Sequence, residues 1–256
     1  FRNEITPGNF IFRTIEFEQM EHQWFCKEGT DQEYYAEFKK RAWQFLLDLG
    51  FKEEHLRFHD HDKLAHYAKA ACDIQYDFPM GWSELNGIHN RTDYDLSRHQ
   101  EYSGKSMMYV DPVTQERYIP YVIEYSIGAD RLMLAALSEA YDEETLENGE
   151  VRNVMRFHPA IAAYKAAVLP LQKGLAPQAK ELLAKLKKHF LVTYDEAGSI
   201  GKRYRRQDEI GTPYCLTVDF DTLENGTVTV RDRDTMEQVR MNADEVIAFL
   251  REKCAF

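Results

Sequence analysis

An apolar strand that runs through a glycine directly into a helix is the feature that most constrains this 256-residue chain. Residues 118–127 read YIPYVIEYSI and lead to Gly128, and a helix is predicted over 129–141. Glu124 lies inside this strand, and Arg131 lies at the start of the helix. Burying a charge is costly unless the charge is paired or used. The junction therefore predicts polar side chains at the edge of a functional site.

A second charged strand is predicted near the beginning of the chain. Residues 10–25 alternate aromatic and β-branched residues with charged ones, and carboxylates fall on both faces. The preceding Thr6-Pro7-Gly8-Asn9 is typical of a turn. We therefore expect a hairpin, with Ile5 and its upstream neighbours in the first arm and residues 10–25 in the second.

The remaining pattern predicts two domains, 1–153 and 154–256. In the first, helices are predicted over 31–49, ending at Gly50, and over 61–71. An acidic, Gly-containing stretch at 142–153 is interpreted as a linker. The second reads as a compact α/β domain. Its predicted elements are a strand at 160–170, a helix at 176–189, a strand at 190–194, a Gly-rich basic segment at 198–211, a strand at 213–220, a hairpin turn at Glu224-Asn225-Gly226 with a return strand at 227–231, and a helix at 243–253.

Composition excludes several classes of protein. The net charge is −11, which excludes an overall basic coat for nucleic acid but permits a local basic patch. No apolar run approaches the roughly 20 residues that span a bilayer. The four cysteines form no CxxC pair, so we interpret them as free thiols in a reducing compartment. A GxxxxGK[ST] motif is absent, so a P-loop is excluded.

The charged clusters suggest a chemistry. Arg2 and Arg13 with nearby glutamates form one cluster, and Glu124 and Arg131 belong to the other. Guanidinium groups suit phosphate oxygens, whereas carboxylates suit a metal ion or an ammonium group. A surface network of ion pairs is the alternative reading of the same residues.

Three histidines, at 59, 61 and 66, form a separate group. A zinc site is conceivable there, but the spacing matches no standard ligand pattern. We therefore interpret these histidines as hydrogen-bonding groups of the fold.

Four segments resemble one family of enzymes. Arg2-Asn3-Glu4 with FRTIEFEQME resembles motif 2 of class II aminoacyl-tRNA synthetases, and PYVIEYSIGADR resembles motif 3. Two further segments have sequences similar to those of glycyl-tRNA synthetases of the homodimeric type. They are GWSELNGIHNRTDYDL at 81–96 and GSIGKRYRRQDEIGTPYC at 198–215. The resemblance covers essentially the whole chain.

The resemblance implies an α+β and α/β fold. Residues 1–153 would form part of a class II antiparallel-sheet catalytic domain, followed by a mixed-sheet α/β anticodon-binding domain. Motif 1 of the family would precede Phe1, so we expect that the sequence lacks an upstream part.

The resemblance also implies an ATP site. Arg2 and Arg131 would act on the phosphates as catalytic residues, and Glu84 would hold Mg²⁺. The implied ATP-binding residues are Arg2, Asn3, Glu4, Phe12, Arg13, Thr14, Ile15, Glu16, Phe17, Glu84, Leu85, Gly128, Ala129, Asp130 and Arg131.

Glycine and tRNA sites follow in the same way. The implied glycine-binding residues are Phe17, Glu18, Gln19, Met20, Glu21, Glu124, Tyr125, Ser126, Ile127 and Gly128. The basic segment has four positive charges within five residues and one tyrosine among them, which suits RNA phosphates and base stacking. The implied tRNA-binding residues are Lys202, Arg203, Tyr204, Arg205 and Arg206.

The function expected from the resemblance is that of a cytoplasmic, homodimeric glycine–tRNA ligase in protein biosynthesis. It would use ATP and Mg²⁺ to form glycyl-adenylate and would transfer glycine to tRNA(Gly), with no membrane or DNA partner. The alternative is an inactive synthetase-like module that binds tRNA as an accessory. A synthetase for another amino acid is disfavoured by the GWSEL and HNRTDYDL segments.

Overall fold

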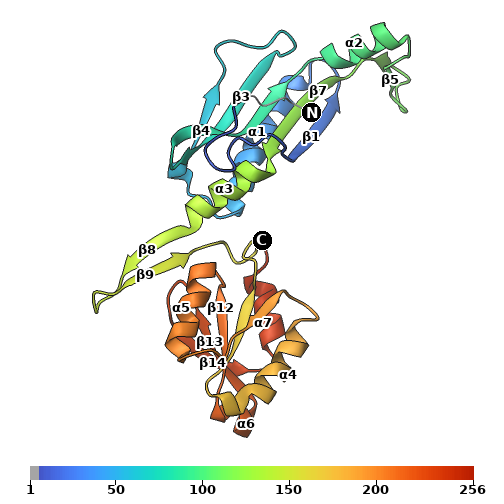
Figure 1. The fold of residues 1–256 in the computed structure, drawn as a ribbon. Coiled ribbons are helices and arrows are strands. Elements are labelled where there is room, and N and C mark those ends of the chain that lie inside the picture. Colours follow the sequence, from blue (N-terminus) through green and yellow to red (C-terminus); the bar gives the residue numbers. More distant parts are fainter. Residues whose placement is uncertain (1–5) are drawn as a thin grey trace. The chain divides into compact units, whose positions relative to one another are not determined.

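The computed structural model describes residues 6–256 and divides the chain into two compact units, with the boundary between Ser138 and Glu139 (Figure 1). Each unit contains its own five-stranded sheet. Among the described residues, no helix has the length and apolar character needed to cross a membrane.

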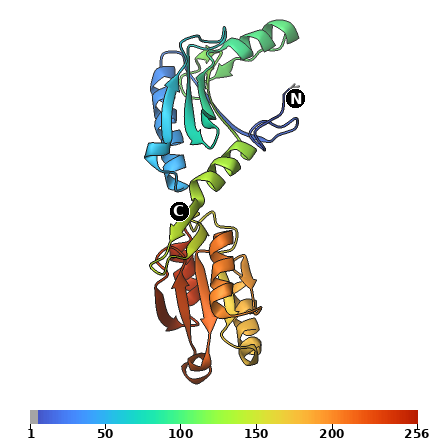
Figure 2. The same ribbon diagram turned by 60° about the vertical axis from the view of Figure 1, so that its left-hand side comes forward.

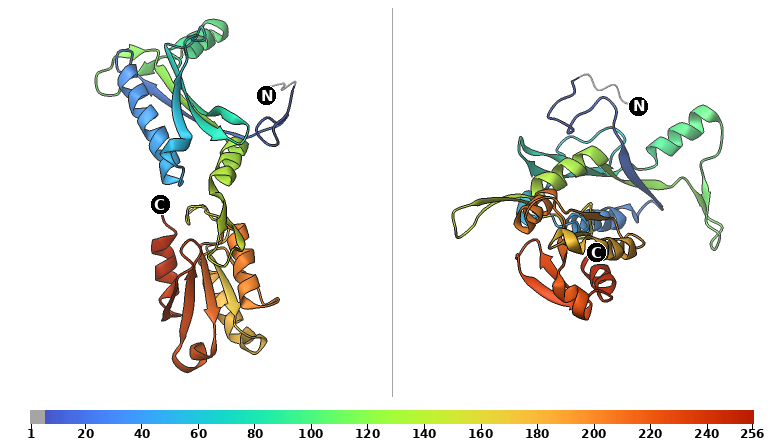
Figure 3. Two further views of the ribbon diagram at one scale, coloured as in Figure 1. Left: turned by 90° about the vertical axis from the view of Figure 1, so that its left-hand side faces the viewer. Right: turned by 60° about the horizontal axis from the view of Figure 1, so that its bottom comes forward.

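The sheet of the first unit is antiparallel throughout, in the order β1-β7-β4-β3-β2. Helix α1 (Asp31–Asp48) runs along one side of this sheet (Figures 2 and 3). Its buried residues, among them Phe38 and Leu46, belong to one apolar core with Ile88 and Ile127 of the strands. The strands are β1 (Gln19–Cys26), β2 (Leu56–Asp60), β3 (Ala70–Phe78), β4 (Gly81–Asn90) and β7 (Tyr121–Gly128).

Helix α1 confirms the prediction over 31–49, because both of its ends are anchored. Asp31 is fully buried and accepts hydrogen bonds from Lys69 at 2.8 Å and Asn90 at 2.7 Å. At the other end, Gly50 has a positive φ of 94°. The Phe51 backbone N–H donates to the Leu46 carbonyl at 3.1 Å, which satisfies an orphan carbonyl of the last turn.

The predicted strand-to-helix junction is also confirmed. Strand β7 ends at Gly128, and helix α3 (Ala129–Ala140) begins at the next residue. Between β4 and β7 the chain forms α2 (Tyr94–Ser103) and a short two-stranded sheet of β5 (Tyr109–Val110) and β6 (Arg117–Tyr118).

The second unit has a mixed sheet in the order β11-β10-β12-β13-β14. Strand β10 is parallel to β11 and β12, whereas β12, β13 and β14 are antiparallel. Alternate residues of β10 enter two cores, one formed with α4 and α7 and the other with α5. The strands are β10 (Ala166–Pro170), β11 (Val192–Tyr194), β12 (Tyr214–Val218), β13 (Thr227–Asp232) and β14 (Gln238–Asn242); the helices are α4 (Ala176–Leu186), α5 (Ile200–Ile210), α6 (Phe220–Asn225) and α7 (Val246–Lys253).

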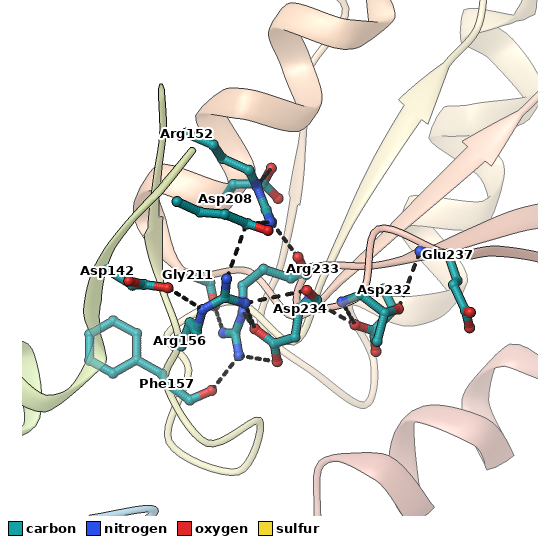
Figure 4. Close-up of polar contacts among 12 residues, drawn as sticks. Asp142, Arg152, Arg156, Phe157, Asp208, Gly211, Asp232, Arg233, Asp234 and Glu237 are labelled. Carbon is teal, nitrogen blue, oxygen red and sulfur yellow. Dashed lines mark hydrogen bonds and ion pairs between the residues drawn. The ribbon is translucent and has the colours of Figure 1, made fainter. Parts of the chain in front are cut away.

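The predicted linker at 142–153 was wrong, because this stretch forms an ordered hairpin of β8 (Tyr141–Thr145) and β9 (Val151–Met155). Its acidic side chains are paired with arginines: Asp142 contacts Arg156 at 2.8 Å (Figure 4), and Glu144 contacts Arg152 at 2.7 Å. The charges that resemble a solvated linker therefore stabilise a folded element.

The Arg152 side chain then anchors this hairpin to helix α5. Its Nε donates to the carboxylate of Asp208 at 2.9 Å, and neither residue is exposed (Figure 4). Arg231 of β13 donates to the same carboxylate at 2.8 and 3.1 Å. One buried aspartate therefore joins the hairpin, α5 and the sheet.

Two further predictions were wrong in the first unit. The predicted helix at 61–71 is a loop that leads into β3, and His61 contacts Asp73 at 2.8 Å there. The predicted strand at 10–25 begins only at Gln19, since the chain before it turns, with Asn9 and Phe10 at positive φ. Ile5 and the rest of the predicted first arm lie outside the described residues.

Two segments of the second unit also differ from their prediction. Residues 198–211 were described only as a Gly-rich basic segment, and helix α5 occupies most of them. The Asn225-Gly226 turn does not join two strands directly, because α6 lies between β12 and β13 and ends at Gly226. Asp219 and Thr222 form a capping box at the start of α6. This local helix signal competes with the hairpin that was predicted from Asn225-Gly226. Strand β14 was not predicted.

Candidate functional site

The face of the first sheet opposite α1 carries the polar residues of the strands. In the ladder, Glu124 of β7 lies between Gln23 of β1 and His89 of β4. In the next row, Ser126 lies between Glu21 and Gly87. Because side chains two residues apart share a face, these two rows form one polar surface. We call it the polar face.

Glu124 is the most constrained group on the polar face, with 8% exposure. Arg91 donates to its carboxylate at 3.1 Å, Gln23 donates at 3.2 Å, and His89 Nδ1 lies 3.6 Å away. Contact with His89, followed by the charge of Arg91, holds the pKa of Glu124 below its ordinary value despite burial. The carboxylate is therefore a fixed negative charge at neutral pH.

Arg91 is in turn held in place. Its Nε donates to Asp95 at 2.8 Å, and its guanidinium lies over the ring of Tyr67, 4.3 Å from the centroid. These contacts fix the guanidinium against both an acid and an aromatic face. Both residues belong to the segment HNRTDYDL, but no role was expected for Arg91 or His89 from the sequence. Only the pairing of β4 with β7 places them beside Glu124.

A pocket of about 180 Å³ lies where β7 ends and α3 begins. Arg131 forms one wall: its guanidinium stacks on Phe12 at 4.2 Å and donates to the backbone carbonyls of Phe12 and Glu84, both at 3.1 Å. The residues that line the pocket are Ile11, Phe12, Arg13, Thr14, Phe17, Glu18, Gln19, Glu84, Leu85, Ser126, Gly128, Asp130 and Arg131.

The pocket contains most of the described residues that were expected to bind ATP. Two of them also contact each other, as Thr14 donates to Asp130 at 3.5 Å. Ile15, Glu16 and Ala129 are not part of the lining. Arg2, Asn3 and Glu4, which complete the expected set, lie outside the described residues.

The residues expected to bind glycine are divided between the two sides of the sheet. Phe17, Glu18, Gln19, Ser126 and Gly128 line the pocket, and Glu21 and Glu124 lie on the polar face beside it. The remaining three line a different, apolar pocket with residues of α1; they are Met20, Tyr125 and Ile127.

Glu84 is the residue expected to hold a metal ion. Its carboxylate is about half exposed at the pocket, with Oε2 3.4 Å from an Arg131 nitrogen. Within residues 6–256, no cluster of three or more His, Cys, Asp or Glu side chains is arranged as a metal site. This arrangement still fits Mg²⁺, which is usually held by one or two carboxylates together with substrate phosphates and water.

The expected tRNA-binding residues of α5 have different surroundings from one another. Arg203 is 4% exposed and donates to the backbone carbonyls of Gly198 and Pro170. Tyr204 hydrogen-bonds Thr217 at 2.7 Å. These two side chains are occupied inside the unit.

The outer residues of the same helix lie at the surface. Arg205 pairs with Glu150 at 3.0 Å, and Arg206 Nε donates to Asp195 at 2.8 Å. Lys202 is exposed. Lys202 and Arg206 therefore have the most exposed cationic side chains of this set, although Arg206 is also paired with Asp195.

Comparison with known proteins gives a consistent picture. Residues 165–253 match the family model "Anticodon binding domain". The whole chain is similar to glycine–tRNA ligases of Clostridium kluyveri, at 62% identity, and Clostridium perfringens, at 61%. It spans 56% of the length of each. The Geobacillus kaustophilus glycine–tRNA ligase is 60% identical over the same share.

A solved structure shares the fold. It is described as the RNA-binding domain of threonyl-tRNA synthetase from Cryptosporidium parvum. The TM-score is 0.71 at 17% identity, over 96% of this chain and 66% of the other. The resemblance to the glycine–tRNA ligase family, and an anticodon-binding fold in the second unit, are therefore confirmed.

Proposed function

Because the whole chain is homologous to glycine–tRNA ligases, we propose that it activates glycine with ATP and transfers the glycyl group to tRNA(Gly). The observation that carries this proposal is the position of the pocket. Arg131, Glu84 and Phe12 meet at the end of β7, directly beside the carboxylates of the polar face. A phosphate site and an ammonium site thus adjoin one another.

In the first step, the glycine carboxylate attacks the α-phosphorus of ATP. The products are glycyl-adenylate and pyrophosphate. We propose that Glu124 and Glu21 bind the glycine ammonium group, and that Ser126 adds a hydrogen bond. A fixed carboxylate recognises an ammonium group without contacting a side chain, which suits the smallest amino acid. Holding both reactants in line can lower the barrier substantially without a side-chain nucleophile.

Arg131 would bind the phosphates of ATP during this step. Its guanidinium is already held by two backbone carbonyls and by the ring of Phe12, so little reorganisation is needed. Mg²⁺ bound with the nucleotide would neutralise phosphate charge, and Glu84 is the carboxylate at the pocket that would hold it. Arg2, Asn3 and Glu4 would complete the nucleotide site.

In the second step, a hydroxyl of the terminal ribose of tRNA attacks the carbonyl carbon of the adenylate, and AMP leaves. We propose that the first unit is part of the catalytic domain and that the second unit binds the anticodon region. The carboxyl ends of β10, β11 and β12 lie at one edge of a partly parallel sheet, the usual place for a ligand. Lys202 and Arg206, on the helix that follows β11, would contact tRNA phosphates there. We further propose a homodimeric, cytoplasmic enzyme.

The test is charging of tRNA(Gly) with labelled glycine by the gene product at its natural full length. Glycyl-tRNA formation that requires ATP and fails with alanine and serine would support the proposal. An inactive tRNA-binding module is less favoured, because such a module has no need for the Arg131–Glu84 pocket. Tight tRNA binding without any charging would favour that module instead.

A further inference from the structure

His89 presents a buried nitrogen to the carboxylate of Glu124. Its Nδ1 has no hydrogen-bond partner and lies 3.6 Å from Glu124 Oε1, just beyond hydrogen-bond distance. The side chain is 20% exposed. A buried polar atom without a partner requires an explanation. A nitrogen that faces a carboxylate is favourable only when it carries a hydrogen, so Nδ1 is the donor side of this ring.

The position of the His89 ring is built into the sheet. An ideal Cβ placed on Gly87 would lie 2.8 Å from Cε1 of His89, closer than real side chains approach. The ring therefore covers the glycine, in the row that also contains Ser126 and Asp73. A glycine at position 87 leaves space for the imidazole beside Glu124 and Ser126, which are proposed to bind the substrate glycine.

Charged groups reach His89 from several elements. Glu124 of β7 is its neighbour in the ladder, and Arg91 comes directly after the end of β4, the strand that contains His89. His61, which follows β2, lies with its ring centroid 6.3 Å away and is paired with Asp73 of β3 at 2.8 Å. Glu21 of β1 lies in the adjacent row. His89 is thus the titratable group in contact with Glu124, while Arg91 stays charged at all relevant pH values.

We propose that His89 is a positioning residue for Glu124, and that it acts on the binding of glycine through this carboxylate. This inference rests on the proposed function. A ring N–H directed at Oε1 fixes the orientation of the carboxylate, together with the donors from Arg91 and Gln23. The negative charge of Glu124 is then already aimed at the place where the ammonium group would bind, so binding needs little reorganisation.

The experiment measures KM and kcat for glycine in pyrophosphate exchange with the full-length protein. KM should rise about fivefold or more in His89→Ala, with a smaller change in kcat, as typical couplings between groups predict. His89→Asn keeps an N–H donor and should recover part of this loss. His99→Ala is the matched control, because His99 is exposed on α2 and should leave KM unchanged.

A second readout does not depend on activity. The affinity for glycine, measured by calorimetry without ATP, should fall in His89→Ala by about the same factor as KM rises. A KM in His89→Ala that equals the wild-type value, an unchanged affinity, or an effect of equal size in His99→Ala would each overturn the inference. Failure of the proposed function is distinguishable, because it would abolish glycine-dependent exchange in the wild type as well.

Discussion

Substitution of Asp208 by asparagine should destabilise the second unit severely. Its carboxylate is fully buried and accepts from Arg152 at 2.9 Å and from Arg231 at 2.8 and 3.1 Å. Asparagine removes the negative charge that the two buried guanidinium groups share, and it leaves Arg152 with Glu144 as its remaining acidic partner. Breaking a buried ion pair in this way costs about 3–5 kcal/mol.

For a domain of known size, this loss of unfolding free energy corresponds to a shift in melting temperature. For a unit of somewhat more than 100 residues, each kcal/mol corresponds to about 3–6 °C, so Tm should fall by about 10–30 °C. Thermal unfolding followed by circular dichroism would give the shift. Hydrogen exchange of the β10 and β12 amides would assign it to the second unit.

A matched control separates burial from charge. Asp221→Asn removes an exposed aspartate that lies 3.2 Å from Arg240, and pairs of this kind contribute about 0–1 kcal/mol. The double variant Asp208→Asn with Arg231→Met should recover part of the loss, because the guanidinium that was paired with Asp208 is removed as well. An Asp208→Asn shift no larger than that of Asp221→Asn would refute the reasoning.

Three further predictions concern the two sites. Arg131→Ala should lower glycine-dependent pyrophosphate exchange about 100- to 1,000-fold with little change in tRNA affinity, because a preorganised phosphate contact is lost; equal loss of tRNA binding would contradict this. Replacing Lys202 and Arg206 by glutamine should weaken tRNA binding and reduce its salt slope by about one for each phosphate contact, measured by filter binding; an unchanged slope would exclude them. Because the pKa of Glu124 is lowered, its stabilisation is present above its ordinary value of 4.5 and is lost as pH falls through the folded value. The Tm of the wild type should therefore fall more steeply below pH 4.5 than that of Glu124→Gln, and parallel curves would show that the carboxylate contributes nothing.

Local signals were sufficient where one element decided its own structure. Helix α1 combines regular apolar spacing with Gly50 at its end, and the β7–α3 junction combines an apolar run with Gly128. The same junction also located the site, because charged groups in an apolar strand are informative wherever they occur.

Partners distant in sequence decided the rest. The hairpin of β8 and β9 looked like a linker because its acidic residues are paired with Arg152 and Arg156, and nothing local to 142–153 shows that Asp208 of α5 will hold Arg152. Similarly, the sequence indicates that Arg203 is free to bind RNA, but its guanidinium donates hydrogen bonds to backbone carbonyls inside the unit. Charge in a sequence does not distinguish a surface from a buried network.

The surroundings of Glu124 illustrate the same limit within the site. Glu124 itself stood out, but Gln23, His89 and Arg91 come from β1, β4 and the residues after β4. A strand register determines which of these residues become neighbours, and a shift by one residue would place them on the other face. The pairing of strands was therefore needed to find them.

The most direct test of the account is glycine-dependent exchange of pyrophosphate into ATP by the full-length protein, compared with its Glu124→Gln variant. The account predicts exchange with glycine but not with alanine or serine, and a large rise in KM for glycine in the variant, since the fixed charge beside the pocket is removed. Exchange that is absent with glycine, or that is unaffected by loss of the Glu124 charge, would contradict it.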